Sequence, residues 1–494
     1  MSDKQTVGSV TYQKVGKEYF EQRGLRRYAK VWSLWALGVG GVISGHYSGW
    51  NLGLANGFGS MLVALLVIAA MYWGLIFSLA EMSPALPHTG AAYSFARSAM
   101  GPWGGMVTGL AESIEYILTP AVIVYFIGSY MTAIFETPAA YQPIWWMASY
   151  ALFLLLNLRG VELSFRVSVI VTLGALGVLA VFWVSAIPHF DLHRWALEGG
   201  PWLPMGWNGV LAALPFAVWL FLAIEQLPLA AEESADPKKD MPKALILGMS
   251  TLMVSALLTV FLNSGVGSIE PGKMQGASSL AKSSEPLLDG FRVIYGGAAA
   301  KTLAFLAVIG LIASFHTIIY AYGRQIYSLS RAGYYLGFMS VTSGKHKVPH
   351  MALYTGTVLG LATMLVAWFA APANDRGALI GGTLLNMAVF GAMISYAMQG
   401  LSFILLRRNL PDIDRPYRSP VGSPGAAVTI VIALVTLYFQ LQDPVYRNGV
   451  YAVAVFYVLG LAYFALWGRH RLILSPEEHF AMSKGKARGD HTAS

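Results

Sequence analysis

The sequence predicts an all-α membrane protein with twelve transmembrane helices, and three observations lead to this prediction. First, 56% of the 494 residues are hydrophobic and only 12% are charged, whereas soluble domains carry about 25% charged residues. Second, long apolar stretches follow one another with short polar gaps. Third, lysine and arginine are unevenly divided between alternate gaps, as in chains that cross a bilayer repeatedly. Such a chain has too little polar surface to cover itself in water and must be solvated by lipid.

The apolar stretches have the length that a membrane requires. A bilayer core about 30 Å thick is crossed by roughly 20 helical residues. Twelve stretches fit this length: 31–56, 58–80, 102–132, 143–158, 163–187, 208–230, 245–267, 299–322, 352–371, 379–406, 425–442 and 449–467. We expect one membrane domain, 31–470, with helices 1–5 in about 31–187, helices 6–10 in about 208–406 and helices 11–12 in about 425–467. Residues 1–30 and 471–494 are expected to be cytoplasmic tails.

The distribution of positive charge predicts the orientation of these spans. An even number of spans places both termini on one side of the membrane. With that side inside, 26 Lys and Arg fall in cytoplasmic segments and 7 in external ones, in agreement with the positive-inside rule. We therefore expect a multi-pass protein of the inner (plasma) membrane with both termini in the cytoplasm. Basic residues beside anionic lipid explain the net charge of +8, so no nucleic-acid partner is expected.

Two of the spans carry defects that a plain lipid-facing helix would not need. Span 1 has five glycines among the thirteen residues from Leu37 to Gly49, which favours an unwound or closely packed segment near residues 43–45. Span 6 contains Glu225, followed by Pro228, which removes a backbone donor. The two spans are five apart. Paired interrupted helices in two five-helix halves are typical of inverted-repeat transporters with a site at the bilayer midplane.

Ionisable residues deep in the spans indicate what such a site would bind. Three acids, Glu112, Glu115 and Glu225, lie well inside spans 3 and 6. Two histidines, His46 and His316, lie inside spans 1 and 8, and no Lys or Arg lies as deep. A charge at the bilayer centre costs at least about 3 kcal/mol, so such groups are functional candidates by default. Acids without fixed cationic partners favour a cationic substrate, whereas a lone membrane histidine is also commonly a structural hydrogen-bonding group.

Six short motifs occur in order along the chain. They are Val42-Ile43-Ser44-Gly45; Ala80-Glu81-Met82-Ser83-Pro84 with Pro87, Gly90 and Tyr93; Asn157-Leu158-Arg159-Gly160-Val161; Ala231-Glu232-Glu233-Ser234-Ala235-Asp236-Pro237 with Met241-Pro242; Ser330-Arg331-Ala332-Gly333; and Arg415-Pro416-Tyr417. Over nearly the whole chain this pattern resembles the amino acid–polyamine–organocation superfamily of transporters. The stretch His46-Tyr47-Ser48-Gly49-Trp50-Asn51 is most similar to the ethanolamine permease branch. The resemblance implies a LeuT-like 5+5 inverted repeat plus two terminal helices, with broken helices 1 and 6.

The resemblance also implies which residues form the site. Expected substrate-binding residues are Ile43, Ser44, Gly45, Tyr47, Glu112, Glu115, Tyr116, Trp219, Phe221, Ala223 and Glu225. Expected ion- or proton-coupling residues are Glu225, Glu115, His316, Ser314 and Thr317. In relatives a glutamate in the sixth helix is linked to coupling or gating, and a tryptophan there can stack on a cationic substrate. Glu81, Glu232, Glu233 and Arg331 match motifs at the cytoplasmic ends, where ion pairs or gates are expected.

The expected function is import of a small organic amine, ethanolamine above all, by alternating access. The bulky His46-Tyr47 after Ser44-Gly45 disfavours amino acids as the substrate. A cationic or neutral amino-acid permease or exchanger nevertheless remains the alternative function. The coupling ion, H⁺ or Na⁺, is left open, because a lysine found in helix 5 of some relatives is Ala175 here. An ion channel fits the broken helices less well.

Several other classes of function are disfavoured by what the sequence lacks. There is no cysteine, which excludes thiolate metal sites, disulfides and cysteine nucleophiles. No HExxH or GxSxG motif is present, so no enzyme, cofactor or bound metal is expected. The expected partners are the amine substrate and the lipid bilayer, and a monomer would suffice for transport.

Overall fold

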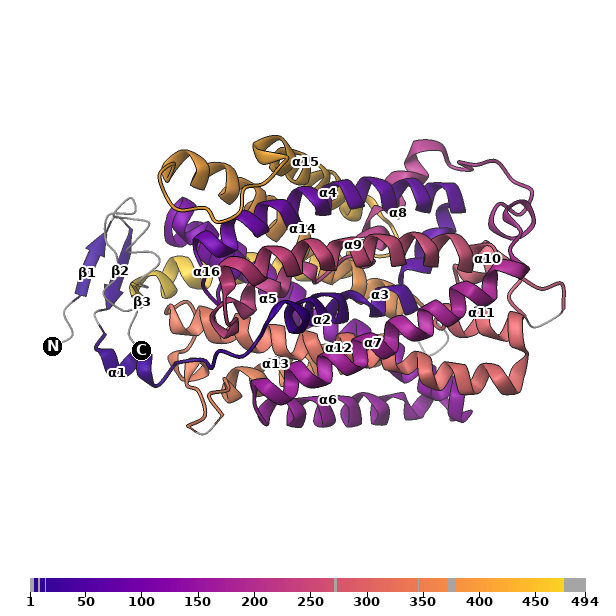
Figure 1. Cartoon of the computed structure of the whole chain (residues 1–494), viewed down its shortest axis with the longest axis horizontal. Coiled ribbons are helices and arrows are strands. Elements are labelled where there is room, and N and C mark those ends of the chain that lie inside the picture. The colour runs from indigo at the N-terminus through magenta and orange to yellow at the C-terminus, as the bar shows by residue number, and fades with distance from the viewer. Residues whose placement is uncertain are drawn as a thin grey trace.

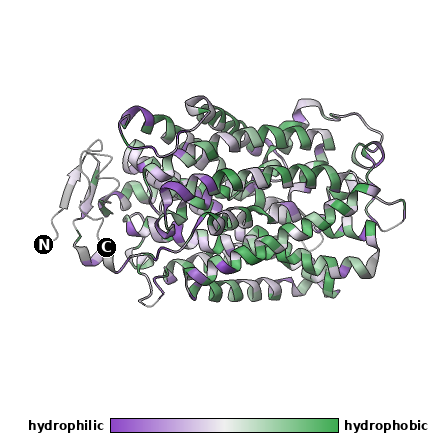
Figure 2. Cartoon of the chain, in the orientation of Figure 1, coloured by the Kyte–Doolittle hydropathy of each residue, from purple (hydrophilic) through white to green (hydrophobic). Residues whose placement is uncertain are grey.

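The computed structural model shows a bundle of long helices that lie roughly parallel to its longest axis (Figure 1). The structure describes residues 4–7, 9–13, 15–270, 273–344, 346–371 and 378–474. Most of the predicted tail 471–494 therefore lies outside the described residues. Apolar residues cover the helices along most of their length, and many hydrophilic ones gather near their ends and in the connections (Figure 2). This is the surface that a lipid-solvated bundle requires.

The described residues contain twelve helical regions that make up the bundle, and each overlaps a predicted span. They are α2 (Val31–Val42) with α3 (Ser44–Tyr47) and η1 (Trp50–Asn56), α4 (Phe58–Ala85), α5 (Ala91–Phe135), α6 (Gln142–Leu158), α7 (Val161–Ala186), α8 (Gly206–Trp219) with η5 (Ile224–Glu233), α9 (Pro237–Ser264), α12 (Gly297–Arg331), α13 (His350–Ala370), α14 (Ala378–Asn409), α15 (Gly422–Gln442) and α16 (Arg447–Leu466). Among the described residues, ten helices are long and apolar enough to cross a membrane. The other two regions are the interrupted span 1 and the 17-residue α6, so the count of twelve stays a prediction.

Smaller elements lie at the two ends of the bundle. At one end β1 (Lys4–Val7) pairs antiparallel with β2 (Val10–Gln13), which pairs parallel with β3 (Leu472–Ile473). Also present are α1 (Lys17–Glu21), η2 (Ala139–Tyr141), η3 (Ile187–His189), η4 (Leu192–Ala196), α10 (Ala277–Leu280), α11 (Pro286–Tyr295), η6 (Gly337–Ser340) and η8 (Gly468–His470). We call the end that carries the sheet the terminal end, and the end that carries α10 and α11 the opposite end (Figure 1). The segments next to both chain termini thus lie together, as an even number of spans requires.

Spans 1 and 6 are both interrupted, as predicted. In span 1, α2 ends at Val42 and the short α3 ends at Tyr47; Ser48 is extended, and Gly49 with φ 92° precedes η1. In span 6, α8 ends at Trp219, and Ala223 takes a left-handed conformation with φ 86° before η5. The two interruptions touch, because a Cβ on Gly45 would lie 2.3 Å from the carbonyl oxygen of Trp219. Only glycine allows this approach, which supports the closely packed interpretation of span 1. The chain leaves helical geometry a few residues later than the predicted residues 43–45, at Ser48 and Gly49.

Helix packing surrounds these interruptions with five other helices. The interrupted α2 packs on α7, α9 and α12, and η5 packs on α2, α4, α5 and α9. On the other side α5 lies along α14 and α12. The middle of span 6 therefore faces α4 and α5 inside the protein, out of contact with lipid.

Candidate functional site

Five buried side chains meet where span 6 is interrupted, and we call them the central acidic cluster. They are Tyr72 of α4, Glu115 and Tyr116 of α5, Glu225 of η5 and Tyr396 of α14. The Tyr116 hydroxyl donates to Glu225 Oε1 at 3.3 Å, and the Tyr396 hydroxyl donates to Glu115 Oε1 at 3.1 Å. The Tyr72 hydroxyl donates to that of Tyr396 at 3.1 Å. Three tyrosines thus hold two carboxyl groups in place.

The two carboxyl groups of the cluster lie close enough to interact directly. Glu225 Oε2 accepts from the backbone N–H of Ala223 at 3.0 Å, whereas Glu115 Oε2 is buried without a hydrogen-bond partner among the described residues. The partners that the structure gives these acids are hydroxyl and backbone groups, none of them cationic. Burying two carboxylates without positive charge is costly. The cluster is therefore suited to bind protons or an ammonium group.

Glu112 lies one helical turn before Glu115 and continues the acidic face of α5. Its Oε2 accepts from Gln325 Nε2 of α12 at 2.8 Å, and its Oε1 is buried without a partner in the described part of the chain. Spans 3 and 6 thus place all three predicted acids in one part of the protein interior.

Other predicted residues line the contact between spans 1 and 6. The ring of Phe221 packs on that of Tyr72, with centroids 5.3 Å apart. Trp219 is buried and donates from Nε1 to the carbonyl of Ser48 at 2.9 Å. Ile43 and Ser44 lie at the interruption of span 1. Of the substrate-binding residues expected in span 6, Phe221 and Ala223 are therefore next to the acidic cluster, whereas Trp219 contacts span 1.

Some predicted residues face other parts of the protein. The Tyr47 hydroxyl donates to the carbonyl of Ala175 in α7 at 2.7 Å. His316 contacts Asn157 and Ser164 at 3.2 Å each, and His46 contacts Ser255 at 3.0 Å. Both ring nitrogens of His316 thus have hydrogen-bond partners, whereas Nδ1 of His46 is buried without a partner among the described residues. The Tyr47 hydroxyl contacts α7 and not the acids.

The predicted sodium ligands lie beside the interruption of span 1. Ser314 Oγ donates to the carbonyl of Gly40 at 2.7 Å and accepts from the backbone N–H of Ser44 at 2.8 Å. Thr317 Oγ1 donates to the carbonyls of Ala313 and Ser314 in its own helix, at 3.2 and 3.1 Å. Ser314 thus links span 8 to span 1 through two hydrogen bonds, one that its hydroxyl donates and one that it accepts.

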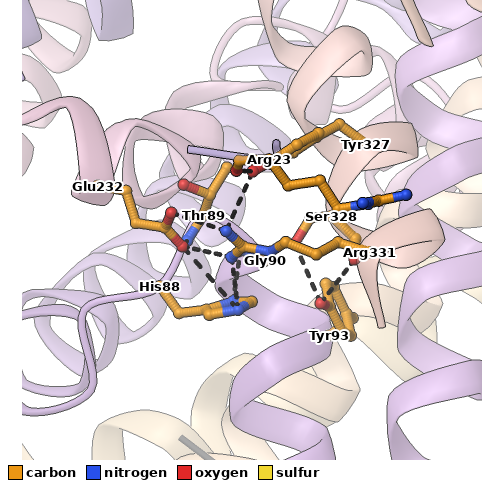
Figure 3. Close-up of polar contacts among 9 residues, drawn as sticks. All are labelled: Arg23, His88, Thr89, Gly90, Tyr93, Glu232, Tyr327, Ser328 and Arg331. Atoms are coloured by element: carbon orange, nitrogen blue, oxygen red, sulfur yellow. Dashed lines mark hydrogen bonds and ion pairs between the residues drawn. The ribbon is translucent and has the colours of Figure 1, made fainter. Parts of the chain in front are cut away.

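Ion pairs close the terminal end of the bundle, as the motifs predict. Arg331 contacts both carboxylate oxygens of Glu232 at 2.5 and 2.9 Å and approaches His88 Nε2 to 2.9 Å (Figure 3). The backbone N–H of Thr89 also donates to Glu232, at 3.1 Å. These contacts join spans 6 and 8 to the segment between α4 and α5.

Further contacts strengthen this closure. Arg324 pairs with Glu233 at 2.9 Å, and both side chains are at most 1% exposed. Arg407 pairs with Glu81 at 2.6 Å. The N-terminal segment lies across the same region, since the Tyr327 hydroxyl donates to the carbonyl of Arg23 (Figure 3). The ion pairing expected of Glu81, Glu232, Glu233 and Arg331 is confirmed.

Polar contacts also close the opposite end. Asn51 Nδ2 donates to the carbonyls of Leu280 and Ser283 at 2.7 and 2.9 Å. Ser129 of α5 donates to Glu285, whose pKa is raised by burial. The central acidic cluster is thus enclosed from both ends in this arrangement.

Sequence reasoning missed Tyr72, Tyr396 and Gln325. Tyr72 and Tyr396 are single polar side chains inside apolar stretches, and the chain has 25 tyrosines. Spacing within one helix cannot select them, because they meet the acids only through the packing of α4, α12 and α14 on α5 and η5. For Tyr72 and Tyr396 the one available signal was a polar tip far from any predicted span end, whereas Gln325 lies three residues beyond the predicted span 299–322.

Comparison with known proteins agrees with this architecture. Residues 30–461 match the amino acid permease family. The chain is 23% identical over 436 residues to the branched-chain amino acid permease BcaP of Bacillus subtilis, which covers 84% of this chain and 88% of the relative. It is 24% identical over 452 residues to the methylthioribose transporter of Bacillus subtilis (86% and 90%) and 24% identical over 462 residues to the D-serine/D-alanine/glycine transporter of Escherichia coli (90% and 94%). The family match covers most of the chain, so this multi-pass membrane protein belongs to the amino acid permease family of transporters.

Proposed function

We propose that the protein is a secondary active transporter of the plasma membrane that imports a small organic amine, ethanolamine above all, with the terminal end facing the cytoplasm. The observation that carries this proposal is the pair Glu115 and Glu225, buried together without a cationic partner among their contacts. An ammonium group placed between them gains about 4 kcal/mol from one ionised carboxylate at 4 Å and an effective dielectric constant near 20.

The number of acids supports coupling to protons. Two facing carboxylates are neutralised by two positive charges, and a monovalent amine brings one. A proton on the second carboxyl group would supply the other, so that amine and proton move together. The three tyrosine hydroxyls of the cluster provide hydrogen bonds to either protonation state.

The contacts of span 1 favour an amine over an amino acid. A substrate carboxylate needs free donors near the acids, and the backbone N–H of Ser44 is already bonded to Ser314 Oγ. A carboxylate would also be desolvated close to Glu115 and Glu225. Ethanolamine avoids both costs, because its hydroxyl is neutral.

A small-molecule amino-acid permease is the second candidate, and the names of the relatives favour it. Two of the three relatives above are named for amino acids, while the third is named for methylthioribose. A competition experiment separates the candidates: uptake of radiolabelled ethanolamine into proteoliposomes, with glycine, alanine, lysine and arginine as competitors. Strong uptake that these amino acids do not reduce supports the amine. Absent ethanolamine uptake alongside amino-acid uptake would replace it with the amino-acid function.

A further inference from the structure

A cavity at the terminal end lies outside the transport site and has no role in the mechanism above. Its volume is about 310 Å³, which is the size of a small-molecule site. Its lining comprises Arg26, Arg159, Gly160, Val161, Glu162, Leu163, Arg166 and His346. These residues come from the segment before α2, the turn between α6 and α7, the start of α7 and the connection between η6 and α13.

The cavity has an excess of positive charge. Three arginines and one histidine share it with one acid, Glu162. That acid is already paired, because Arg166 Nη2 contacts its Oε1 at 2.6 Å. In the part of the chain that the structure describes, Arg26 and Arg159 have no ion-pair partner. An anion in the cavity would therefore meet two uncompensated guanidinium groups, which bind phosphate oxygens in pairs of parallel hydrogen bonds.

The backbone adds donors to those of the arginines. Helix α7 starts at Val161 inside the cavity, and no side chain caps its first turn. The first N–H groups of a helix lack intrahelical acceptors. Gly160 has φ 117°, and a Cβ there would lie 3.4 Å from His346 Nδ1. Glycine at this turn therefore lets the start of α7 lie close to His346 on the other side of the cavity. The first N–H groups of α7 thus add hydrogen-bond donors to the anion site that the arginine-lined cavity defines.

The position of the cavity indicates which anion would reach it. On α6, Leu155 lies one turn before Arg159 and is 56% exposed; on α7, Ile170 lies one turn after Arg166 and is 70% exposed. Exposed apolar residues on both helices mark the surface that lipid chains cover. The cavity thus lies at the edge of the apolar belt, at the depth of phospholipid headgroups.

We propose that this cavity binds the phosphate of an anionic phospholipid in the leaflet at the terminal end. The bound phosphate would link the segment before α2 to the start of α7. That segment is already held against span 6, since the backbone N–H groups of Tyr28 and Ala29 both donate to the carbonyl of Glu233, at 2.8 and 2.9 Å. Arg166 Nε also donates to the Tyr28 hydroxyl at 3.4 Å. The lipid therefore stabilises the arrangement in which the terminal end is closed.

The test uses the full chain purified in neutral detergent, with thermal unfolding followed by intrinsic tryptophan fluorescence. Short-chain phosphatidylglycerol, short-chain phosphatidylcholine and inorganic phosphate are titrated separately, and native mass spectrometry counts retained lipids. The wild type should be stabilised by phosphatidylglycerol and not by phosphatidylcholine or inorganic phosphate at equal concentration. The double variant Arg26→Gln, Arg159→Gln should bind phosphatidylglycerol at least about tenfold more weakly, since two charged hydrogen-bonding groups are lost.

A matched control is Arg408→Gln, which removes an exposed arginine of the same end outside the cavity. It should respond to phosphatidylglycerol like the wild type. Both variants change exposed side chains, and their unfolding temperatures without lipid show whether they fold. Equal responses of the double variant and the control would overturn the proposal. Equal stabilisation by phosphatidylcholine, or by inorganic phosphate, would overturn the assignment to an anionic lipid.

Discussion

At the scale of single residues, Glu225 holds the interrupted segment and faces Glu115 at the same time. Its Oε2 accepts from the N–H of Ala223, a non-glycine residue with φ 86°, a conformation that costs about 1 kcal/mol or more. Glutamine keeps this acceptor and loses the charge. Glu225→Gln should therefore fold normally but lower amine transport by about 100-fold or more, measured as uptake into proteoliposomes beside thermal unfolding.

The control for this variant is Glu136→Gln, which neutralises an exposed acid paired with Lys301 at the opposite end. Its uptake should stay near that of the wild type. If folded Glu225→Gln protein transports as well as Glu136→Gln, the acid pair is not the binding group.

Tyr396 joins two members of the central acidic cluster through one hydroxyl. It donates to Glu115 and accepts from Tyr72. Tyr396→Phe leaves both partners short of a hydrogen bond, which costs about 1–3 kcal/mol. We expect roughly tenfold weaker amine binding in a calorimetric titration, and unchanged binding for Tyr438→Phe, whose ring is 59% exposed. Equal affinities of the two variants would show that the hydroxyl does not position the acid.

At the scale of helices, the contact between spans 1 and 6 depends on one glycine. A Cβ on Gly45 would lie 2.3 Å from the carbonyl oxygen of Trp219, a backbone atom that cannot turn aside. Gly45→Ala should push the two interrupted segments apart, lower the stability by about 1–3 kcal/mol and abolish transport. Thermal unfolding and uptake report the two effects separately.

Gly177 of α7 is the matched comparison, because a Cβ there would meet nothing within 4 Å. Gly177→Ala should be neutral or stabilising by up to about 1 kcal/mol. A Gly45→Ala protein as stable and active as Gly177→Ala would contradict the close contact.

Much of the helical architecture follows from the sequence alone, because apolar length and glycine content act locally. The predicted spans overlap the helical regions of the described residues, and span 6 is interrupted close to the predicted place, whereas span 1 leaves helical geometry at Ser48 and Gly49 instead of at residues 43–45. The sheet that joins the two ends of the chain was not predicted, since β3 pairs residues 472 and 473 with a strand more than 450 residues away. Tyr72 and Tyr396 were not predicted for the same reason, because they are distant in sequence from the acids they serve. The three acids could be recognised as charges in apolar stretches, but their hydroxyl partners are fixed only by tertiary packing.

At the scale of the whole molecule, both ends of the bundle are closed around one buried acidic cluster. Arg331 with Glu232 closes the terminal end and Asn51 closes the opposite end. Transport by alternating access requires these contacts to break in turn. In the proposed function, a substrate enclosed between them would balance the charges of Glu115 and Glu225.

The proposed amine specificity is tested most directly by a binding titration at near-neutral pH on one preparation of the purified chain, with ethanolamine, glycine, alanine and arginine as ligands. Ethanolamine should bind far more tightly than glycine or alanine, because its ammonium group meets the two acids and it brings no carboxylate. Arginine carries a second positive charge and tests the cationic amino-acid alternative. Glycine or alanine binding as tightly as ethanolamine would contradict the amine assignment and favour a general amino-acid permease.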